Sequence, residues 1–474
     1  MRANASAGSK RPVSSKPRVT VVVLAAGKGV RMNSRTPKVL HPVAGRPMLL
    51  WSMAAARALD PERTLVVTNP SQEGVQAALN GEAQTVSQAK QLGTGHALAQ
   101  VTAAHRTAGP VVVLYADAPL LRGETLRALL AEHEKSRAAV TLLTANLDDP
   151  SGYGRIVRAR TGTFRDIVEE KDATHEQKEI HEVNSGVYVF TGRELWPALL
   201  KLENKNRAGE YYLTDVVNLI KGKVNTMAVS DPMEILGIND RRQLAQAERV
   251  MRQRILGALM TSGVTITDPA TTFIGADVQI GRDTVVLPFS FISGESTVGE
   301  NCLIGPFAQI NNAIIGDSCR IERAHIEKST LATNVHVGPF SRLRPGSVLD
   351  DGVRVGTHAE IKNSHIGAGT AIAHFSAVLD SDVGAGANIG AGTITANFDG
   401  VDKHRTEIGD RAQVGSDTIL VAPVRVGDDA YTAAGSVITA DVPAGSLAIE
   451  RSEQKIVPGW TERRRGHRKR EVST

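Results

Sequence analysis

The feature that most constrains the fold is a ladder of aliphatic residues, usually six positions apart, through the C-terminal half of the chain. Glycine often follows the aliphatic residue, and a small residue often stands four positions after it, as in IGAGT at 366–370. This repeat predicts a parallel β-helix, in which short strands meet at tight corners and each coil covers the next. The inward positions are Ile274, Ile280, Val286, Ile292, Val298, Ile304, Ile310, Ile315, Ile321, Ile326, Leu331, Val337, Leu343, Leu349, Val355, Ile361, Ile366, Ile372, Val378, Val383, Ile389, Ile408, Val414, Leu420, Val426, Thr432 and Ile438.

The ladder breaks once, between Ile389 and Ile408, where the sequence TITANFDGVDKHRTE supplies an excursion. An insertion in an otherwise regular coil usually serves a site or an interface. We therefore expect this segment to carry functional residues.

The N-terminal half alternates predicted strands with predicted helices. This order implies a mainly parallel, doubly wound, Rossmann-like α/β sheet whose ligands lie beyond the carboxyl ends of the strands. It places 24–32 and 115–117 on the same rim of the sheet. The predicted strands are 19–23, 64–68, 111–115, 139–145, 154–158 and 186–190, and the predicted helices are 48–59, 73–79 and 124–135.

The first predicted strand leads directly into LAAGKGVRM at 24–32, followed by PKVL at 37–40. A turn that contains glycine lets backbone N–H groups approach a phosphate closely. Lys28, Arg31 and Lys38 add cations where such an anion would bind. Neither GxxxxGK[ST] nor a full GxGxxG is present, so the usual nucleotide fingerprints do not apply. The pattern resembles the start of the sugar-phosphate nucleotidyltransferases, and this resemblance implies a nucleoside triphosphate substrate.

Between the two halves, Asp240 can cap a helix with apolar residues at helical spacing that ends near Gly263. We therefore divide the chain into a disordered extension (1–17), a nucleotidyltransferase-like domain (18–242), a linker helix (243–262), a β-helix domain (263–450) and a basic tail (451–474).

The overall charge and the cysteine content exclude several classes of protein. Lysine and arginine number 55 against 50 acidic residues, so no nucleic-acid partner is implied, and we expect the basic runs at 2–18 and 463–470 to be solvated and disordered. No stretch is apolar enough to span a membrane, and 1–17 lacks the hydrophobic segment of a signal peptide, so we expect a cytoplasmic protein. Cys302 and Cys319 share one small inward position of the repeat, which predicts packed thiols rather than a disulfide framework or a zinc site.

Seven segments together carry a specific resemblance to a known family. They are QLGTGHA (91–97), GYGRI (152–156), IVEEKDA (167–173), GEYYLTD (209–215), RLRPG (342–346), NIGAGTIT (388–395) and VGSDT (414–418). Over nearly its whole length the chain resembles the bifunctional bacterial N-acetylglucosamine-1-phosphate uridyltransferases and glucosamine-1-phosphate acetyltransferases, which make UDP-N-acetylglucosamine for peptidoglycan and lipopolysaccharide synthesis. The resemblance implies a left-handed β-helix, a homotrimer and no membrane partner.

For the first half, the resemblance implies that N-acetylglucosamine-1-phosphate attacks the α-phosphorus of UTP and expels pyrophosphate, without a protein nucleophile. Asp117 and Asn239 match Mg²⁺ ligands, although Asp117 also suits a helix or turn cap and Asn239 an ordinary turn. Ala116 stands where the family commonly has glycine, and we expect its methyl group to crowd the nucleotide. By position, UTP would contact Leu24, Ala25, Ala26, Gly27, Arg31, Lys38, Tyr115 and Ala116, uracil would contact Gln88, Gly93 and Thr94, and the amino sugar would contact Gly154, Glu169 and Asn184.

For the second half, the resemblance assigns His374 as the general base that takes a proton from the sugar amine before it attacks acetyl-CoA, with Glu360 orienting it. Each could instead be structural, because a lone histidine usually is and charges on a coil exterior are often only solvated. Ala377 and Phe398 replace tyrosines of the family, so two hydroxyl donors are lost and the acceptor is less secure. By position, Arg344 and Lys362 would bind the sugar phosphate, Asn388 and Asn397 the sugar or the reacting amide, Ala391 the oxyanion through its N–H, and Ser416, Ala434 and Arg451 coenzyme A.

Two other hypotheses remain open. The chain could catalyse only uridylyl transfer and use the β-helix for assembly, as in pyrophosphorylases that make ADP-glucose. It could also be a regulatory scaffold, as in nucleotide-exchange factor subunits of eukaryotic translation initiation. The presence of Lys38, Asp117 and Asn239 argues against a scaffold, because a scaffold need not retain them.

Overall fold

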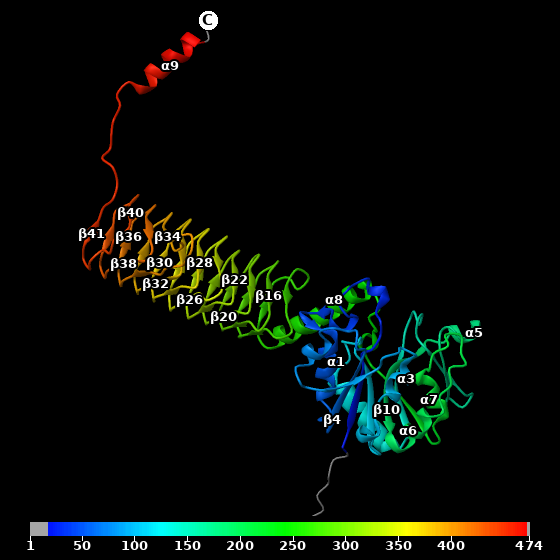
Figure 1. Cartoon of the computed structure of the whole chain (residues 1–474). Helices are drawn as coiled ribbons and strands as arrows, with labels where there is room; N and C mark the ends of the chain where they lie inside the picture. The colour runs from blue at the N-terminus through cyan, green and yellow to red at the C-terminus, as the bar shows by residue number, and fades with distance from the viewer. Residues whose placement is uncertain (1–17, 472–474) are drawn as a thin grey trace, which may run out of the picture. The chain divides into compact units, whose positions relative to one another are not determined.

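The computed structural model describes residues 18–471, so the extension predicted over 1–17 and the last three residues lie outside it. The described chain divides into two compact units between Arg254 and Ile255 (Figure 1). Helix α8 (Arg241–Thr261) contains the division. Asp240 caps this helix as predicted, since its Oδ1 accepts hydrogen bonds from the backbone N–H groups of Arg242 and Gln243, each at 2.9 Å.

The first unit is built on a sheet with the strand order β11-β7-β10-β6-β1-β4-β5. β10 is antiparallel to both of its neighbours, β6 and β7, and the other pairs on this path are parallel. The mainly parallel sheet is thus as predicted. The strands are β1 (Thr20–Leu24), β4 (Arg63–Thr68), β5 (Gln84–Ser87), β6 (Pro110–Tyr115), β7 (Val140–Asn146), β10 (Glu182–Thr191) and β11 (Val224–Ala228), with β8 (Arg155–Arg158) and β9 (Phe164–Val168) forming a hairpin beside β10 and β2 (Pro42–Val43) pairing with β3 (Arg46–Pro47).

Helices cover both faces of this sheet. The apolar residues of β1 show why: Val21 and Val23 join one core cluster, whereas Val22 and Leu24 join the other. Alternate side chains of a strand point to opposite faces, so a continuous apolar run suits a strand buried on both. The helices are α1 (Met48–Arg57), α2 (Val75–Leu79), α3 (Thr94–Ala99), α4 (Gly123–Ser136), α5 (His175–Lys178), α6 (Gly192–Leu199) and α7 (Leu213–Leu219), with short 3-10 turns η1 (Val30–Met32), η2 (Lys38–Leu40), η3 (Ala103–His105) and η4 (Pro232–Ile235).

The second unit is the predicted β-helix, running from β12 (Thr265–Ile266) to β41 (Leu447–Ala448) (Figure 1). Its strands, two or three residues long, stack into three parallel sheets of eleven, ten and nine strands. The ladder residues point inward and are buried, apart from the half-buried Ile280. Cys302 and Cys319 are buried free thiols in the same core, as predicted.

The break in the ladder is shorter than the sequence suggested, because Thr395 continues the six-residue spacing from Ile389. Thr395 lies in β34 (Ile394–Ala396), is buried, and exchanges two hydrogen bonds with the backbone of Leu379, at 2.7 and 2.9 Å. Its methyl group fills the core while its hydroxyl is satisfied locally, so a search for aliphatic residues alone misses it. The excursion proper comprises residues 397–405, called here the 397–405 loop.

The basic run near the C-terminus is helical in the structure, in contrast to the disorder usual for such charge runs. It lies in α9 (Trp460–Glu471), and the guanidinium of Arg464 lies over the ring of Trp460, 5.0 Å from its centroid (Figure 1). Arginine and lysine are good helix formers, and a cation one turn from an aromatic ring adds a favourable contact. No helix within residues 18–471 has both the length and the apolar content needed to cross a bilayer.

Candidate active sites

A cavity of about 430 Å³ opens at the rim of the sheet, where β1 and β6 end side by side. It brings together most of the residues predicted to bind the nucleotide, including 24–28 of the glycine-containing turn and Lys38. Its lining is Leu24, Ala25, Ala26, Gly27, Lys28, Lys38, Val39, Gln88, Gln91, Gly93, Thr94, Ala97, Tyr115, Asp117 and Glu210. Gln91 and Glu210 were missed as individual residues, although they lie in the motifs QLGTGHA and GEYYLTD.

Three segments meet at one charged point of this rim. Lys38 of η2 makes an ion pair with Asp117, which follows β6, and its Nζ donates to Asn239 Oδ1 at 3.1 Å. A backbone hydrogen bond of 2.9 Å from Ile238 to the carbonyl of Asp117 holds two of these segments together. Asp117 and Asn239 therefore direct oxygen atoms at a common point, now filled by an ammonium group. This donor set suits a hard divalent cation completed by phosphate and water oxygens.

The other end of the cavity is shaped by Gln88 and the N-terminus of α3. Gln88 is buried, and its Nε2 donates to the carbonyl of Gly93 at 3.1 Å, which leaves Oε1 to accept a hydrogen bond from a ligand. Gly93 has a φ of 115°, and a Cβ there would lie 2.5 Å from the carbonyl oxygen of Tyr211. Only glycine fits at this position, so the base pocket depends on it.

Gly154, Glu169 and Asn184 also come together, but they do not line the cavity described above. Asn184 N donates to the carbonyl of Gly154 at 2.8 Å, and a Cβ on Gly154 would lie 3.6 Å from Glu169 Oε2. Burial raises the pKa of Glu169, although a 2.9 Å hydrogen bond from the hydroxyl of Thr214 partly opposes it. Burial, with the nearby Glu169 and Asp117 carboxylates, likewise raises the pKa of Tyr115, which connects this cluster with the cavity.

Two predicted nucleotide contacts lie elsewhere. Arg31 is exposed in η1, outside the cavity lining. Ala116 is fully buried in the core, and its N–H bonds to the carbonyl of Leu24 at 3.0 Å. Its methyl group faces the core cluster instead of the cavity, so the expectation that it crowds the nucleotide was wrong.

In the second unit, four predicted residues form a line along one corner of the β-helix, one in each successive coil. They are His374, Ala391, Ser416 and Ala434. The backbone carbonyls of His374, Ala391 and Ser416 each accept a hydrogen bond from the next coil, at 2.9, 2.7 and 2.8 Å. Arg451 extends the line, since its Nη1 donates to the carbonyl of Ala434 at 3.1 Å. The side chains of this line are exposed or half-buried, as a ligand track requires.

Charged side chains gather beside this line. Arg344 Nη1 donates to Glu360 Oε1 at 2.8 Å, and both side chains are more than one third exposed. Lys362 lies on the same strand as Glu360, β28 (Glu360–Lys362), and the adjacent Lys403 ammonium is the largest cause that lowers its pKa. Two neighbouring ammonium groups, those of Lys362 and Lys403, favour the binding of an anion between them. Lys403 was missed, although it stands in the insertion that the sequence marks as functional.

In the structure of the described residues, Glu360 pairs with Arg344 and makes no hydrogen bond with His374, so the predicted contact between Glu360 and His374 is not formed. His374 is exposed, and its Nδ1 lies 3.5 Å from the backbone nitrogen of Thr357. Ala377 stands in register between Glu360 and Ile394 and leaves space on that face.

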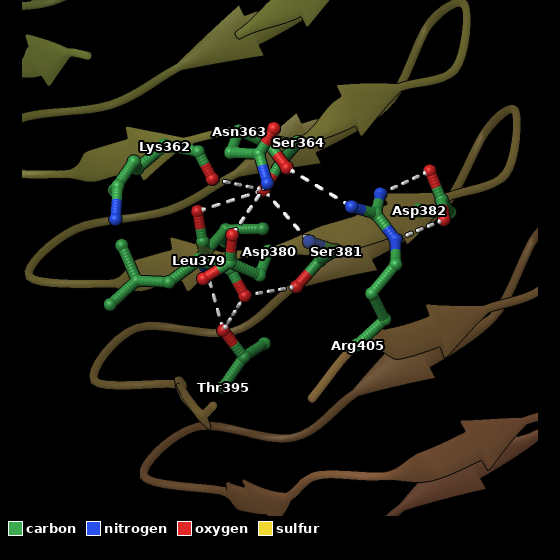
Figure 2. A network of polar contacts seen from close by, with 10 residues as sticks. Lys362, Asn363, Ser364, Leu379, Asp380, Ser381, Asp382, Thr395 and Arg405 are labelled. Carbon is green, nitrogen blue, oxygen red and sulfur yellow. Dashed lines mark hydrogen bonds and ion pairs between the residues drawn. The ribbon is translucent and has the colours of Figure 1, made fainter. Parts of the chain in front are cut away.

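Two of the remaining predicted residues of this site, Asn397 and Phe398, lie in the 397–405 loop. Asn388 is exposed at the start of β33 (Asn388–Ile389), and Phe398 is exposed in the loop. Asn397 begins the loop, and its Nδ2 donates to the buried carboxylate of Asp380. Asp380 was missed by the sequence reasoning. Figure 2 shows it at the centre of a polar network between neighbouring coils.

Comparisons with known proteins match both units. The "MobA-like NTP transferase domain" family matches residues 21–217, and the "GlmU-like, C-terminal hexapeptide" family matches 304–382. Proteins named "Bifunctional protein GlmU" from Syntrophomonas wolfei and Streptomyces avermitilis are each 46% identical to this chain, over 93% and 94% of it and over 99% and 94% of their own lengths. The chain belongs to the bifunctional GlmU family. A GlmU protein from Geobacillus thermodenitrificans, 45% identical over 94% of this chain, agrees.

Membership of the GlmU family confirms the resemblance predicted from the motifs and the fold of both units, a nucleotidyltransferase domain and a left-handed β-helix of hexapeptide repeats. GlmU proteins are bifunctional by name, and predicted site residues gather in each unit of this chain. In the part of the chain that the structure describes, no group of three or more His, Cys, Asp or Glu side chains could hold a metal ion. A cation at Asp117 and Asn239 therefore depends on oxygen atoms of the substrate or water.

Proposed function

We propose that this chain makes UDP-N-acetylglucosamine in two steps, each at its own site. The β-helix transfers acetyl from acetyl-CoA to glucosamine-1-phosphate, and the sheet domain then transfers uridylyl from UTP to N-acetylglucosamine-1-phosphate and releases pyrophosphate. The convergence of Lys38, Asp117 and Asn239 at the cavity rim, in a GlmU-family chain that also presents His374, carries this proposal.

In uridylyl transfer, a phosphate oxygen of N-acetylglucosamine-1-phosphate attacks the α-phosphorus of UTP, and the bond to pyrophosphate breaks. Catalysis then consists of positioning and charge neutralisation. Lys38 and Lys28 neutralise phosphate charge, and Gln88 and Gly93 hold the base. Arg31, exposed on η1 outside the cavity lining, keeps the role near the leaving phosphates only from the family resemblance. Asp117 and Asn239 would bind Mg²⁺, which when present neutralises further negative charge on the triphosphate.

In acetyl transfer, His374 takes a proton from the amino group of glucosamine-1-phosphate, and the amine nitrogen attacks the thioester carbonyl. The carbon–sulfur bond breaks as the amide forms, and coenzyme A leaves as the thiol after it takes up a proton. The N–H of Ala391 stabilises the oxyanion, and coenzyme A lies along Ser416, Ala434 and Arg451. Arg344, Lys362 and Lys403 hold the sugar phosphate.

We further propose a cytoplasmic homotrimer assembled through the β-helix. The last strands of one of its sheets, β34, β37 (Ile419–Val421) and β40 (Val437–Ile438), carry exposed apolar side chains: Ile394, Val421 and Val437 are each between 37% and 41% exposed. Exposed apolar side chains on neighbouring strands favour contact with a second protein surface. UTP and acetyl-CoA are cytoplasmic metabolites, which supports that location. Sedimentation analysis of the purified chain tests the trimer.

Assays of both half-reactions on one preparation test the two activities. We expect pyrophosphate from UTP and N-acetylglucosamine-1-phosphate with Mg²⁺, and free coenzyme A thiol from acetyl-CoA and glucosamine-1-phosphate. No pyrophosphate would overturn the first activity. Pyrophosphate without acetyl transfer would support the alternative in which the β-helix serves only assembly, an outcome consistent with the hydroxyl groups missing at Ala377 and Phe398.

A further inference from the structure

Asp380 is a buried carboxylate at the base of the 397–405 loop. It follows β31 (Ala377–Leu379), has a φ of 48°, and is only 6% exposed. Its backbone is fixed on both sides, because its N–H donates to the carbonyl of Lys362 at 2.9 Å and its carbonyl accepts from Thr406 N at 3.3 Å. The network around it joins three coils (Figure 2). Its side chain therefore has little freedom.

Both oxygens of this carboxylate accept hydrogen bonds from carboxamides. Asn363 Nδ2 donates to Oδ1 at 2.6 Å, and Asn397 Nδ2 donates to Oδ2. An ionised carboxylate has no proton to donate, so each asparagine must present its amino end to Asp380. Asn397 Oδ1 must then point away from Asp380, and no donor within residues 18–471 bonds to it. That oxygen is left to accept a hydrogen bond from a ligand.

The surroundings of Asp380 keep it ionised. Burial alone raises the pKa of this carboxyl group, but the hydrogen bonds from Asn363 and Asn397 and the charges of Lys362 and Lys403 outweigh it, so the pKa is lowered overall. The constraint on the Asn397 carboxamide therefore holds at neutral pH.

The far end of the loop is fixed separately. Arg405 donates two hydrogen bonds to Asp382, at 2.8 and 2.6 Å (Figure 2). Asp382 lies in β32 (Ser381–Val383), two residues after Asp380, and its side chain is 51% exposed. The two carboxylates therefore have different roles. Asp382 fixes the end of the loop through its pair with Arg405, whereas Asp380 determines which atom of the Asn397 side chain faces a ligand.

We propose that Asp380 is a positioning residue for acetyl transfer, which orients the Asn397 carboxamide so that Oδ1 accepts a hydrogen bond from the amino group of the acceptor. This inference rests on the proposed acetyltransferase function. It differs from a purely structural role, because Asp380 is also a negative charge near Lys362 and Lys403. Replacing Asp380 with a neutral residue should leave the affinity for the sugar phosphate equal to that of the wild-type chain or stronger, while the rate of acetyl transfer falls.

Asp380→Asn in the full-length chain tests the proposal. An amide at 380 can donate as well as accept, so the Asn397 carboxamide is free to flip. We expect kcat for acetyl transfer to fall about tenfold, the effect of one hydrogen bond to a charged group, while the KM for glucosamine-1-phosphate stays equal or falls. Uridylyl transfer by the same preparation reports the amount of folded first unit, and an unraised KM for glucosamine-1-phosphate reports that the β-helix is folded. The matched control, Asp382→Asn, removes the Arg405 pair and should change kcat less than about threefold.

A double-mutant cycle separates orientation from general support of the coil. In an Asn397→Ala background, Asp380→Asn should cause no further loss of kcat, because the group it orients is gone. Asp380→Glu, which keeps an acceptor-only group, should recover part of the kcat lost in Asp380→Asn. Losses that multiply in the cycle, an unchanged kcat in Asp380→Asn, or a raised KM in place of a lowered kcat would each overturn the proposal. A wild-type chain inactive in acetyl transfer would instead overturn the proposed function itself.

Discussion

Lys38 Nζ lies 3.1 Å from Asn239 Oδ1, although 201 positions separate the two residues in the chain. The same ammonium pairs with Asp117, so three remote segments of the first unit share one point at the end of the sheet. The Lys38 side chain is only 10% exposed there, and a charge so shielded from water exerts a stronger field on a bound phosphate. The geometry makes uridylyl transfer depend sharply on this lysine.

Lys38→Met should lower pyrophosphate release by about 100-fold, the effect of removing one preorganised electrostatic group. Acetyl transfer by the same preparation should be unchanged, since it occurs in the other unit. Lys28→Met is the matched control: this lysine lines the same cavity but is exposed, so its loss should mainly raise the KM for UTP. Pyrophosphate release at the wild-type rate in Lys38→Met would contradict the assignment.

Removal of divalent cations should stop one activity and spare the other. Excess EDTA is expected to abolish pyrophosphate release and leave acetyl transfer intact, because only the first site offers converging oxygen donors. Asn239→Ala removes one of these donors, so the Mg²⁺ concentration for half-maximal activity should rise about tenfold, with activity recovered at high Mg²⁺. A Mg²⁺ titration curve that Asn239→Ala leaves unshifted would show that the amide is an ordinary turn residue.

His374→Ala should lower kcat for acetyl transfer by about 100-fold or more, the usual contribution of a general base. The measurement is thiol release from acetyl-CoA, with uridylyl transfer to added N-acetylglucosamine-1-phosphate as the internal control. His358→Ala is a comparison from the preceding coil, where the ring stacks on Phe375 at 5.0 Å. Equal losses in both variants would indicate that His374 supports the corner of the coil rather than catalysis.

His133 should make the first unit less stable in acid. It is 4% exposed between Thr141 and Thr191, and burial lowers its pKa from 6.5 to about 4. The unfolded chain therefore binds a proton between pH 6.5 and 4 that the folded chain does not, so stability is lost as the pH falls through this window, by about 3 kcal/mol in total. His133→Gln should flatten this part of the stability curve in urea unfolding at several pH values. The exposed His175→Gln should leave the slope unchanged.

The sequence predicts the fold well because both of its patterns record burial directly. The coils of the β-helix repeat one inward position, and the central strands β1 and β6 of the sheet are nearly continuous apolar runs. The search for aliphatic residues misses Thr395. Its hydroxyl can be buried like a methyl group because it exchanges hydrogen bonds with the backbone of Leu379 in the neighbouring coil. Residues at the ends of parallel strands, such as Asp117, follow from the topology alone.

The contacts within the sites are harder to predict because they depend on side-chain direction and on the path of one loop. The methyl group of Ala116 faces the core although its neighbours Tyr115 and Asp117 line the cavity. Glu360 pairs with Arg344 in the preceding coil, a choice that spacing does not encode. Lys403 becomes a neighbour of Lys362 and Asp380 only because the 397–405 loop folds back onto the coil.

Each residue in the line from His374 to Arg451 lies one coil further along the β-helix than the residue before it, so the line extends over several coils. In the proposed function coenzyme A binds along this line, so its far end would be held several coils away from the thioester bond that breaks. Short acetyl thioesters should therefore react poorly at His374 even though their reactive end is identical.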